Sequence, residues 1–166
     1  MLKIRIARND DLPYIHLCLE RAYPDTHQNA FEWLEKGIEN GQIVIMTDRN
    51  TIHGLALLAS VIPNLFDGEE IGEYELTSSC HIEEDEIIGV DHLTIDPKFR
   101  YGEELHLLLQ YIQGRFKGWS ILLKNSHNMD ESKKAALLHE GFRPTISELF
   151  LVKPYIKDGL ARGFAW

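Results

Sequence analysis

The stretch IIGVDHLTIDPKFRYGEELHLLLQYI, residues 87–112, decides the fold that this sequence predicts. Its first part, residues 87–95, is apolar on both faces and ends before Asp96 and Pro97, which is typical of a central strand in a covered sheet. Beyond Gly102, apolar residues recur at helical spacing and indicate a helix packed on a sheet; they are Leu105, Leu108, Leu109, Ile112 and Phe116. The stretch therefore predicts a buried strand that leads, through a short connection, into a helix.

Alternating and helical patterns predict further elements on both sides of this stretch. Before it we expect a strand at residues 2–6, helices at 12–23 and 28–38, and a hairpin whose strands start at Ile43 and Ile52. After it we expect a strand from Ser120, a helix over 135–138 that Gly141 ends, and a strand at 146–152. Asn128 with Glu131 resembles a capping box for the helix. The order predicts an α/β fold in which helices cover a mixed sheet.

Length and composition place the chain among single-domain globular proteins. Its 166 residues are 44% apolar and 26% charged, so we expect one domain over residues 1–166, with the tail 154–166 unassigned. Two cysteines are too few for a disulfide scaffold. The N-terminus becomes charged too early for a signal peptide, and no apolar run reaches the length of about 20 residues that a membrane span needs. We therefore expect a soluble, cytoplasmic protein.

The net charge of −9 comes from a single segment. Residues 67–86 contain nine Asp and Glu and neither Lys nor Arg, while the rest of the chain is balanced. The segment is either a solvated loop or edge hairpin, or a negative rim that concentrates a cationic ligand. The excess of acids argues against nucleic acid as a partner, because binding to phosphates depends on Lys and Arg.

Two strings, together with the order of elements, carry a family resemblance. LTIDPKFR, residues 93–100, resembles the central strand, the proline and the loop-opening arginine of the GNAT acyltransferases. AALLHEGFRP, residues 135–144, is similar to that family's last helix and Gly-Phe turn. GNAT enzymes move an acyl group from coenzyme A to an amine. The resemblance implies a mixed, mostly antiparallel central sheet flanked by helices, with acetyl-CoA or another acyl-CoA as co-substrate.

The pyrophosphate loop of the family departs from its usual pattern here. That pattern is Gln or Arg, two residues, Gly, one residue, then Gly or Ala, so that backbone N–H groups at a helix start surround the pyrophosphate. The corresponding window is Arg100, Tyr101, Gly102, Glu103, Glu104, Leu105. Arg100 matches, whereas Glu103 and Leu105 occupy the positions of small residues. Either a loop shifted by one residue, with its carboxylates turned outward, still holds coenzyme A, or the glutamates cap the helix themselves.

Asp91 is the candidate general base. Period two places it on one face of the predicted strand with apolar neighbours, where burial would raise the pKa of its carboxyl toward a useful value. The resemblance places a base at this point of the strand in several family members. The alternative is a carboxylate paired with a neighbouring strand or loop. His92 falls on the opposite face and is interpreted as a core histidine.

The resemblance also implies positions that contact the pantetheine arm of coenzyme A. The backbone of Leu93, Thr94 and Ile95 would align the arm and help to polarise the thioester carbonyl. Asn125 would contact the arm after the next strand, although it is equally suited to hydrogen-bond its own loop.

The sequence assigns neither a general acid nor a set of metal ligands. The family's acidic tyrosine is replaced by Leu137, which leaves Cys80, Tyr155 or solvent as proton donor. The eight histidines and two cysteines lack the paired spacing of a zinc site, so we expect no metal.

Two functions from different classes remain. The first is an N-acyltransferase that acetylates a primary amine, on a small-molecule or peptide acceptor of positive charge such as a polyamine, an aminoglycoside or a lysine side chain. The second is a GNAT-like binding or assembly module that has lost coenzyme A chemistry. Neither involves nucleic acid or a membrane, and the sequence leaves open whether the chain forms a homodimer. Fold alone does not separate the two, because function belongs to the site.

Overall fold

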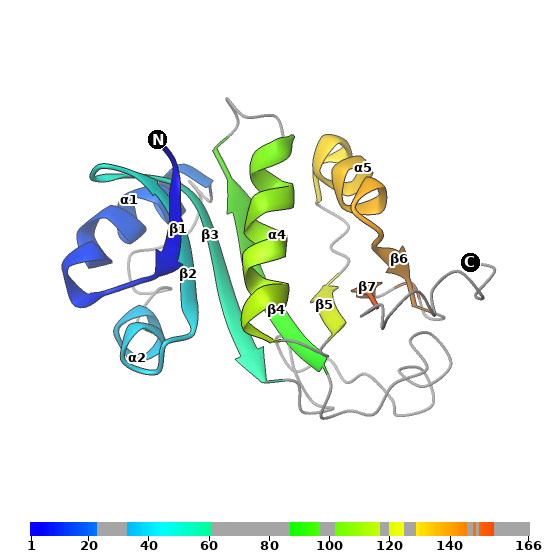
Figure 1. Ribbon diagram of the computed structural model, residues 1–166, viewed down its shortest axis with the longest axis horizontal. Coiled ribbons are helices and arrows are strands. Elements are labelled where there is room, and N and C mark those ends of the chain that lie inside the picture. Colours follow the sequence, from blue (N-terminus) through cyan, green and yellow to red (C-terminus); the bar gives the residue numbers. More distant parts are fainter. Residues whose placement is uncertain are drawn as a thin grey trace. The chain divides into compact units, whose positions relative to one another are not determined.

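The computed structural model describes most of the chain in two compact units (Figure 1). The described residues are 1–22, 33–60, 87–96, 102–116, 120–124, 129–145, 148 and 150–154. The first unit comprises Met1–Ala59 and Asp91–Tyr111, and the second comprises Ser60–Val90 and Ile112–Trp166. The strand and the helix of the deciding stretch, β4 (Ile87–Ile95) and α4 (Glu103–Arg115), contribute residues to both units.

The first unit contains β1 (Lys3–Ile6), β2 (Ile43–Asp48), β3 (Thr51–Ser60) and the second half of β4, in that order across the sheet. β1 pairs antiparallel with β2, and β2 with β3. The hairpin between β2 and β3 turns at Arg49, whose φ of 57° lies in the left-handed region. This confirms the predicted hairpin.

Two helices cover one face of the first unit's strands. A 3-10 turn (Asn9–Asp11) precedes α1 (Leu12–Ala22), and α2 (Trp33–Glu39) precedes β2. Their apolar faces pack with residues in and beside the strands into one core: Ala7, Ile15, Leu19, Leu34, Ile38, Ile43, Ile45, Ile52 and Leu55. The helical and alternating periods read from the sequence therefore meet in a common cluster.

The second unit contains the first half of β4, β5 (Ser120–Lys124), β7 (Phe150–Lys153) and β6 (Arg143–Pro144), in that order, with α5 (Glu131–His139). β4 runs parallel to β5, whereas β5 with β7 and β6 with β7 are antiparallel. The whole is a mixed α/β fold with an open, mostly antiparallel sheet flanked by helices, as predicted.

The predicted order of elements is found with small corrections. The two-residue strand β6 was not predicted. The last strand begins at Phe150 rather than at residue 146, because Glu148 has a φ of 62° that breaks extended backbone. Helix α5 is capped by Asp130, whose carboxylate accepts a hydrogen bond from the Ser132 N–H at 3.2 Å; Asn128, the predicted cap, lies outside the described residues. Gly141 follows α5 with a φ of 99°, as expected for a helix-ending glycine.

Several expectations fall outside the described residues. They concern the start of the second predicted helix at 28–32, the acidic segment 67–86 and the tail beyond Pro154. Among the helices that are described, none is both long and apolar enough to cross a membrane.

An ion pair fixes β1 to the start of α1. The Arg5 guanidinium donates two hydrogen bonds of 2.7 Å to the Asp11 carboxylate, which also accepts the Arg8 N–H at 2.7 Å. Both side chains are largely buried, 29% and 12% exposed. The hydrogen bonds from Arg5 are the main reason why the pKa of Asp11 lies below its ordinary value, against the opposing effect of burial.

Replacing Asp11 tests this ion pair. Because the pKa of Asp11 is lower in the folded than in the unfolded state, its stabilisation is present above the unfolded value of about 3.9 and is lost as pH falls through the folded value. Urea denaturation at pH 7 should show that Asp11→Asn lowers the free energy of unfolding by about 1.5–3 kcal/mol. The difference from wild type should shrink below pH 4. Asp10→Asn, an exposed neighbour, is the control and should change little; equal effects of the two substitutions would contradict the account.

Candidate functional site

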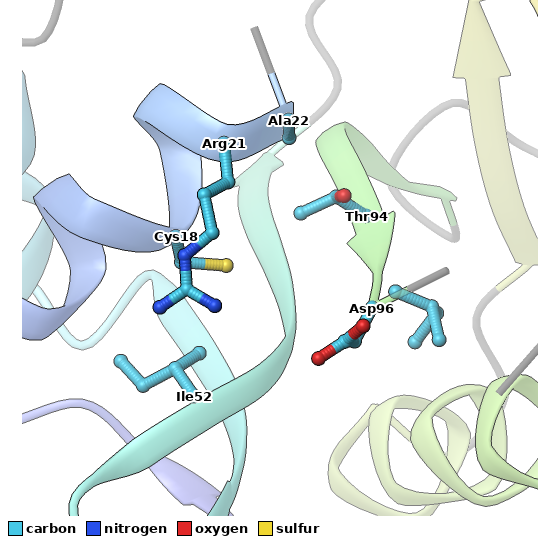
Figure 2. Close-up of a pocket in the computed structure, with 7 residues that line it drawn as sticks. Cys18, Arg21, Ala22, Ile52, Thr94 and Asp96 are labelled. Atoms are coloured by element: carbon cyan, nitrogen blue, oxygen red, sulfur yellow. The ribbon is translucent and has the colours of Figure 1, made fainter. Parts of the chain in front are cut away.

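A cavity of about 450 Å³ lies within the first unit (Figure 2). This volume is in the usual range for a small-molecule site. Three segments supply its lining: the end of α1, the start of β3 and the end of β4. The lining residues are Cys18, Arg21, Ala22, Ile52, Thr94, Ile95 and Asp96.

The spacing of residues on α1 explains why one helix serves both the core and the cavity. Ile15 and Leu19 are fully buried in the core cluster. Cys18, Arg21 and Ala22 are related by i, i+3 and i+4, so they share a neighbouring face of the helix. That face forms the α1 wall of the cavity.

A glycine lets the end of β4 lie close against β3. A Cβ atom on Gly54 would stand 2.9 Å from Ile95 Cδ1 and 3.5 Å from the Thr94 carbonyl oxygen. A larger residue at this position would therefore push the end of the Ile95 side chain, which lines the cavity, away.

His53 and Asp96 join the two strands by both backbone and side chain. The Asp96 N–H donates to the His53 carbonyl oxygen at 2.6 Å, and His53 Nδ1 lies 3.2 Å from Asp96 Oδ2. The His53 side chain is 7% exposed, whereas that of Asp96 is 23% exposed. The buried histidine thus positions a carboxylate that remains accessible from the cavity.

Opposite charges face one another across the cavity. Figure 2 shows the Arg21 guanidinium, carried by α1, and the Asp96 carboxylate, which directly follows β4, both directed into the space between them. Arg21 is exposed and has no hydrogen bond or ion pair to any residue in the described part of the chain. The described wall of the cavity therefore carries one anionic and one cationic side chain.

The thiol of Cys18 is held in its neutral form. Burial raises the pKa of this thiol to about 11; the charge of Arg21 opposes the shift and that of Asp96 adds to it. A thiol with such a pKa is almost entirely protonated near neutral pH, and the thiolate is the reactive form. Cys18 therefore acts as a weakly polar part of the wall and not as a nucleophile.

The residues predicted on the central strand lie in β4, as expected. For Asp91 the structure describes the backbone, and its role as base stays a prediction. Leu93, Thr94 and Ile95 are buried at the end of the strand, and the last two line the cavity. The chain therefore brings part of the predicted pantetheine site to the edge of the cavity.

The residues predicted for the pyrophosphate loop lie partly at the start of α4. Gly102 precedes the helix and is exposed, Glu103 and Glu104 form its first turn, and Leu105 is fully buried. Neither glutamate forms a hydrogen bond or ion pair through its carboxylate with any described residue. Both interpretations of this loop, one shifted by one residue and one capped by its own glutamates, therefore stay predictions. Arg100, Tyr101 and Asn125 lie outside the described residues, as do Cys80 and Tyr155.

Sequence reasoning did not identify Arg21, Cys18 or His53 as site residues. Arg21 stands in the last turn of a helix, where a basic residue is ordinary because it complements the helix dipole. The i, i+3, i+4 spacing from Cys18 marks a shared helix face, but nothing local shows that this face meets the end of β4.

The comparisons with known proteins identify the fold. No family model and no curated protein match the sequence. A GNAT-family acetyltransferase from Bacillus cereus ATCC 10987 superposes with a TM-score of 0.66 at 16% identity, covering 95% of this chain and 99% of that one. A GNAT-family acetyltransferase from Brucella melitensis, in complex with acetyl-CoA, gives 0.59 at 15% identity, covering 95% and 90%.

A third similar structure is the N-acetylglutamate synthase of Neisseria gonorrhoeae, complexed with coenzyme A and L-arginine. Its TM-score is 0.61 at 16% identity, and the match covers 94% of this chain and 34% of that one. The chain therefore has the GNAT fold that residues 93–100 and 135–144 led us to expect.

The state of Cys18 can be tested by alkylation. With a pKa of about 11, its rate of reaction with iodoacetamide should still rise about tenfold per pH unit at pH 9.5, whereas a thiol of ordinary pKa, about 8.5, would be levelling off. Peptide mapping by mass spectrometry follows Cys18 separately from Cys80. Arg21→Gln should slow the reaction further, and urea-unfolded protein supplies the reference. A plateau below pH 9 in the folded protein would contradict this environment.

Proposed function

We propose that the chain is an acyl-CoA-dependent N-acyltransferase that transfers an acetyl or other acyl group to a primary amine. The observation that carries the proposal is the placement of the end of β4 and the start of α4. β4 ends at a cavity with a carboxylate in its wall, and α4 begins after the exposed Gly102 with Glu103 and Glu104 in its first turn. In the GNAT fold, with similar structures solved in complex with acetyl-CoA and with coenzyme A, this arrangement supports an acyl-CoA site.

The residues present fit such a co-substrate. Backbone N–H groups of Gly102, Glu103 and Glu104 would bind the pyrophosphate at the start of α4, where the helix dipole favours an anion. The two carboxylates must then turn outward, and neither has a hydrogen bond or ion pair with a residue that the structure describes. Arg100 and Tyr101 would complete this loop, and the buried Leu105 would anchor its far side.

The strand supplies the remaining contacts. Leu93, Thr94 and Ile95 would align the pantetheine through their backbone, with Asn125 as a further contact. When bound, acyl-CoA supplies a thioester carbonyl as the acyl donor. Asp91 would take the proton that the attacking amine must lose, which makes it the general base. An amide C–N bond forms, the thioester C–S bond breaks, and the departing sulfur takes up a proton.

The acceptor in this proposal carries positive charge. A primary amine is protonated in neutral solution, and the nine acids of residues 67–86 would raise its concentration near the protein. The acceptor is therefore a small molecule or a peptide side chain with one or more ammonium groups.

One observation favours a non-catalytic binding or assembly module instead. Leu137 stands where the family carries a tyrosine acid, and it is fully buried in α5. A buried apolar side chain at this place protonates nothing. The two experiments below separate the alternatives.

Turnover tests the enzyme directly. With acetyl-CoA and primary amines, wild type should release free thiol, detected with a chromogenic disulfide. Asp91→Asn should lower kcat/KM by roughly 10²–10⁴-fold, because an amide cannot accept the proton. Glu35→Gln, an exposed substitution on α2, is the matched control and should leave the rate unchanged. A rate unaffected by Asp91→Asn would remove this residue from the mechanism.

Calorimetry tests the co-substrate without requiring an acceptor. Wild type should bind acetyl-CoA with a Kd in the micromolar range, and Arg100→Glu should weaken binding at least about tenfold by replacing a phosphate partner with a like charge. Arg115→Gln at the opposite end of α4 should bind as wild type does. Absence of heat at millimolar acetyl-CoA would instead favour the binding module.

A further inference from the structure

Arg21 gives the cavity a cation that has no partner among the described residues. Its side chain is exposed at the end of α1, and Figure 2 shows the guanidinium directed into the cavity. A guanidinium presents paired N–H donors whose geometry matches a carboxylate. Asp96, the other charged residue in the described wall, already has a partner in His53, whose Nδ1 lies 3.2 Å from Asp96 Oδ2. The cavity therefore offers Arg21 to an anionic group of a ligand.

The proposed reaction leaves one place for such an anionic group. The amine acceptor is a cation in neutral solution, so Arg21 would repel it. The phosphates of coenzyme A are assigned to the backbone N–H groups of residues 102–104, at the start of α4. The acyl group is the part of the reacting molecules that remains. A negative charge on the acyl group would meet Arg21 without competing with either of the other two contacts.

The end of β4 serves both the proposed co-substrate site and the cavity. Thr94 and Ile95, whose backbone would align the pantetheine, are also lining residues of the cavity. The acyl group is joined to the thiol end of the pantetheine. An acyl group longer than acetyl would therefore extend from this strand end into the cavity.

The rest of the described wall suits a short hydrocarbon chain between the thioester and Arg21. Ile52 and Ile95 are buried apolar side chains, and the Cys18 thiol is neutral. Methylene groups are stabilised when they leave water for such a wall. A volume of about 450 Å³ is also far more than an acetyl group occupies. The cavity can therefore hold an acyl chain with a charged end.

We propose that the transferred acyl group carries a terminal carboxylate, as in the coenzyme A thioesters of short dicarboxylic acids, and that Arg21 binds this carboxylate. The inference rests on the proposed acyltransferase function and specifies its acyl donor. In the reaction the nitrogen of the neutral amine forms a bond to the thioester carbon, the C–S bond breaks, and the proton that the amine loses ends on the departing sulfur. The terminal carboxylate is unchanged. Arg21 is then a substrate-binding residue.

Three thioesters separate the charge of the acyl group from its length. Succinyl-CoA and butyryl-CoA have acyl chains of equal length and differ in the terminal carboxylate, and acetyl-CoA is the short reference. With cadaverine as the amine, wild type should use succinyl-CoA at least about tenfold better than butyryl-CoA in kcat/KM, the factor expected for one charge-assisted contact. Mass spectrometry of the product identifies the acyl group on the amine.

Substitutions assign this preference to Arg21. Arg21→Gln should abolish it by raising the KM for succinyl-CoA, and should leave butyryl-CoA unaffected. Arg21→Lys keeps the charge and should retain part of the preference. Arg21 is exposed, so both variants should fold as wild type does. Arg8→Gln, at an exposed arginine outside the described wall of the cavity, is the control and should leave the ratio unchanged.

Calorimetric titration without an amine measures the same contact in the absence of turnover. Wild type should bind succinyl-CoA at least about tenfold more tightly than butyryl-CoA, and Arg21→Gln should bind the two equally. Equal binding of the two by wild type contradicts the inference. Absence of binding by all three thioesters contradicts the proposed function and the inference with it.

Turnover separates a failure of the inference from a failure of the proposed function. Transfer of all three acyl groups with equal efficiency, or a succinyl preference that survives Arg21→Gln, would overturn the inference and leave the acyltransferase intact. An equal loss of affinity for all three thioesters in Arg21→Gln would assign Arg21 to a phosphate of coenzyme A. A higher KM for 6-aminohexanoate, but not for cadaverine, would assign Arg21 to a carboxylate of the acceptor. Either of these two results also overturns the inference.

Discussion

The contact between His53 and Asp96 is the constraint on which the site depends. Two hydrogen bonds, one through the backbone and one through the side chains, hold the end of β4 against the start of β3. Gly54 leaves room for the Ile95 side chain at this contact, because a Cβ atom there would stand 2.9 Å from Ile95 Cδ1. The same contact aims the Asp96 carboxylate into the cavity and fixes where the chain leaves the sheet on its way to α4.

The core and the cavity share their elements, so stability and binding are coupled. Ile15 and Leu19 hold α1 in the apolar cluster, and the adjacent helix face carries Cys18 and Arg21. Burial that packs α1 also raises the pKa of Cys18 and keeps the thiol neutral. The charged residues in the described wall of the cavity are Arg21 and Asp96.

The spacing of apolar residues in the sequence predicts the helices and strands. Residues 87–95 are apolar on both faces of a strand, and they predict the bounds of β4. The helical spacing of apolar residues after Gly102 predicts α4 to within a residue or two. Glu148 and Asp130 were missed because a left-handed φ and the choice between neighbouring caps depend on local geometry that composition does not specify. The placement of Arg21 and Asp96 at one cavity was not predictable, since packing alone brings together these residues, which lie far apart in the chain.

The central claim is that the end of β4 and the start of α4 form an acyl-CoA site. A crystal structure of the protein grown with coenzyme A tests it most directly. The account predicts the pyrophosphate against the backbone N–H groups of Gly102–Glu104, with both glutamate side chains turned away and the pantetheine beside Leu93–Ile95. Coenzyme A bound elsewhere, or carboxylates of Glu103 and Glu104 folded over those N–H groups, would contradict it.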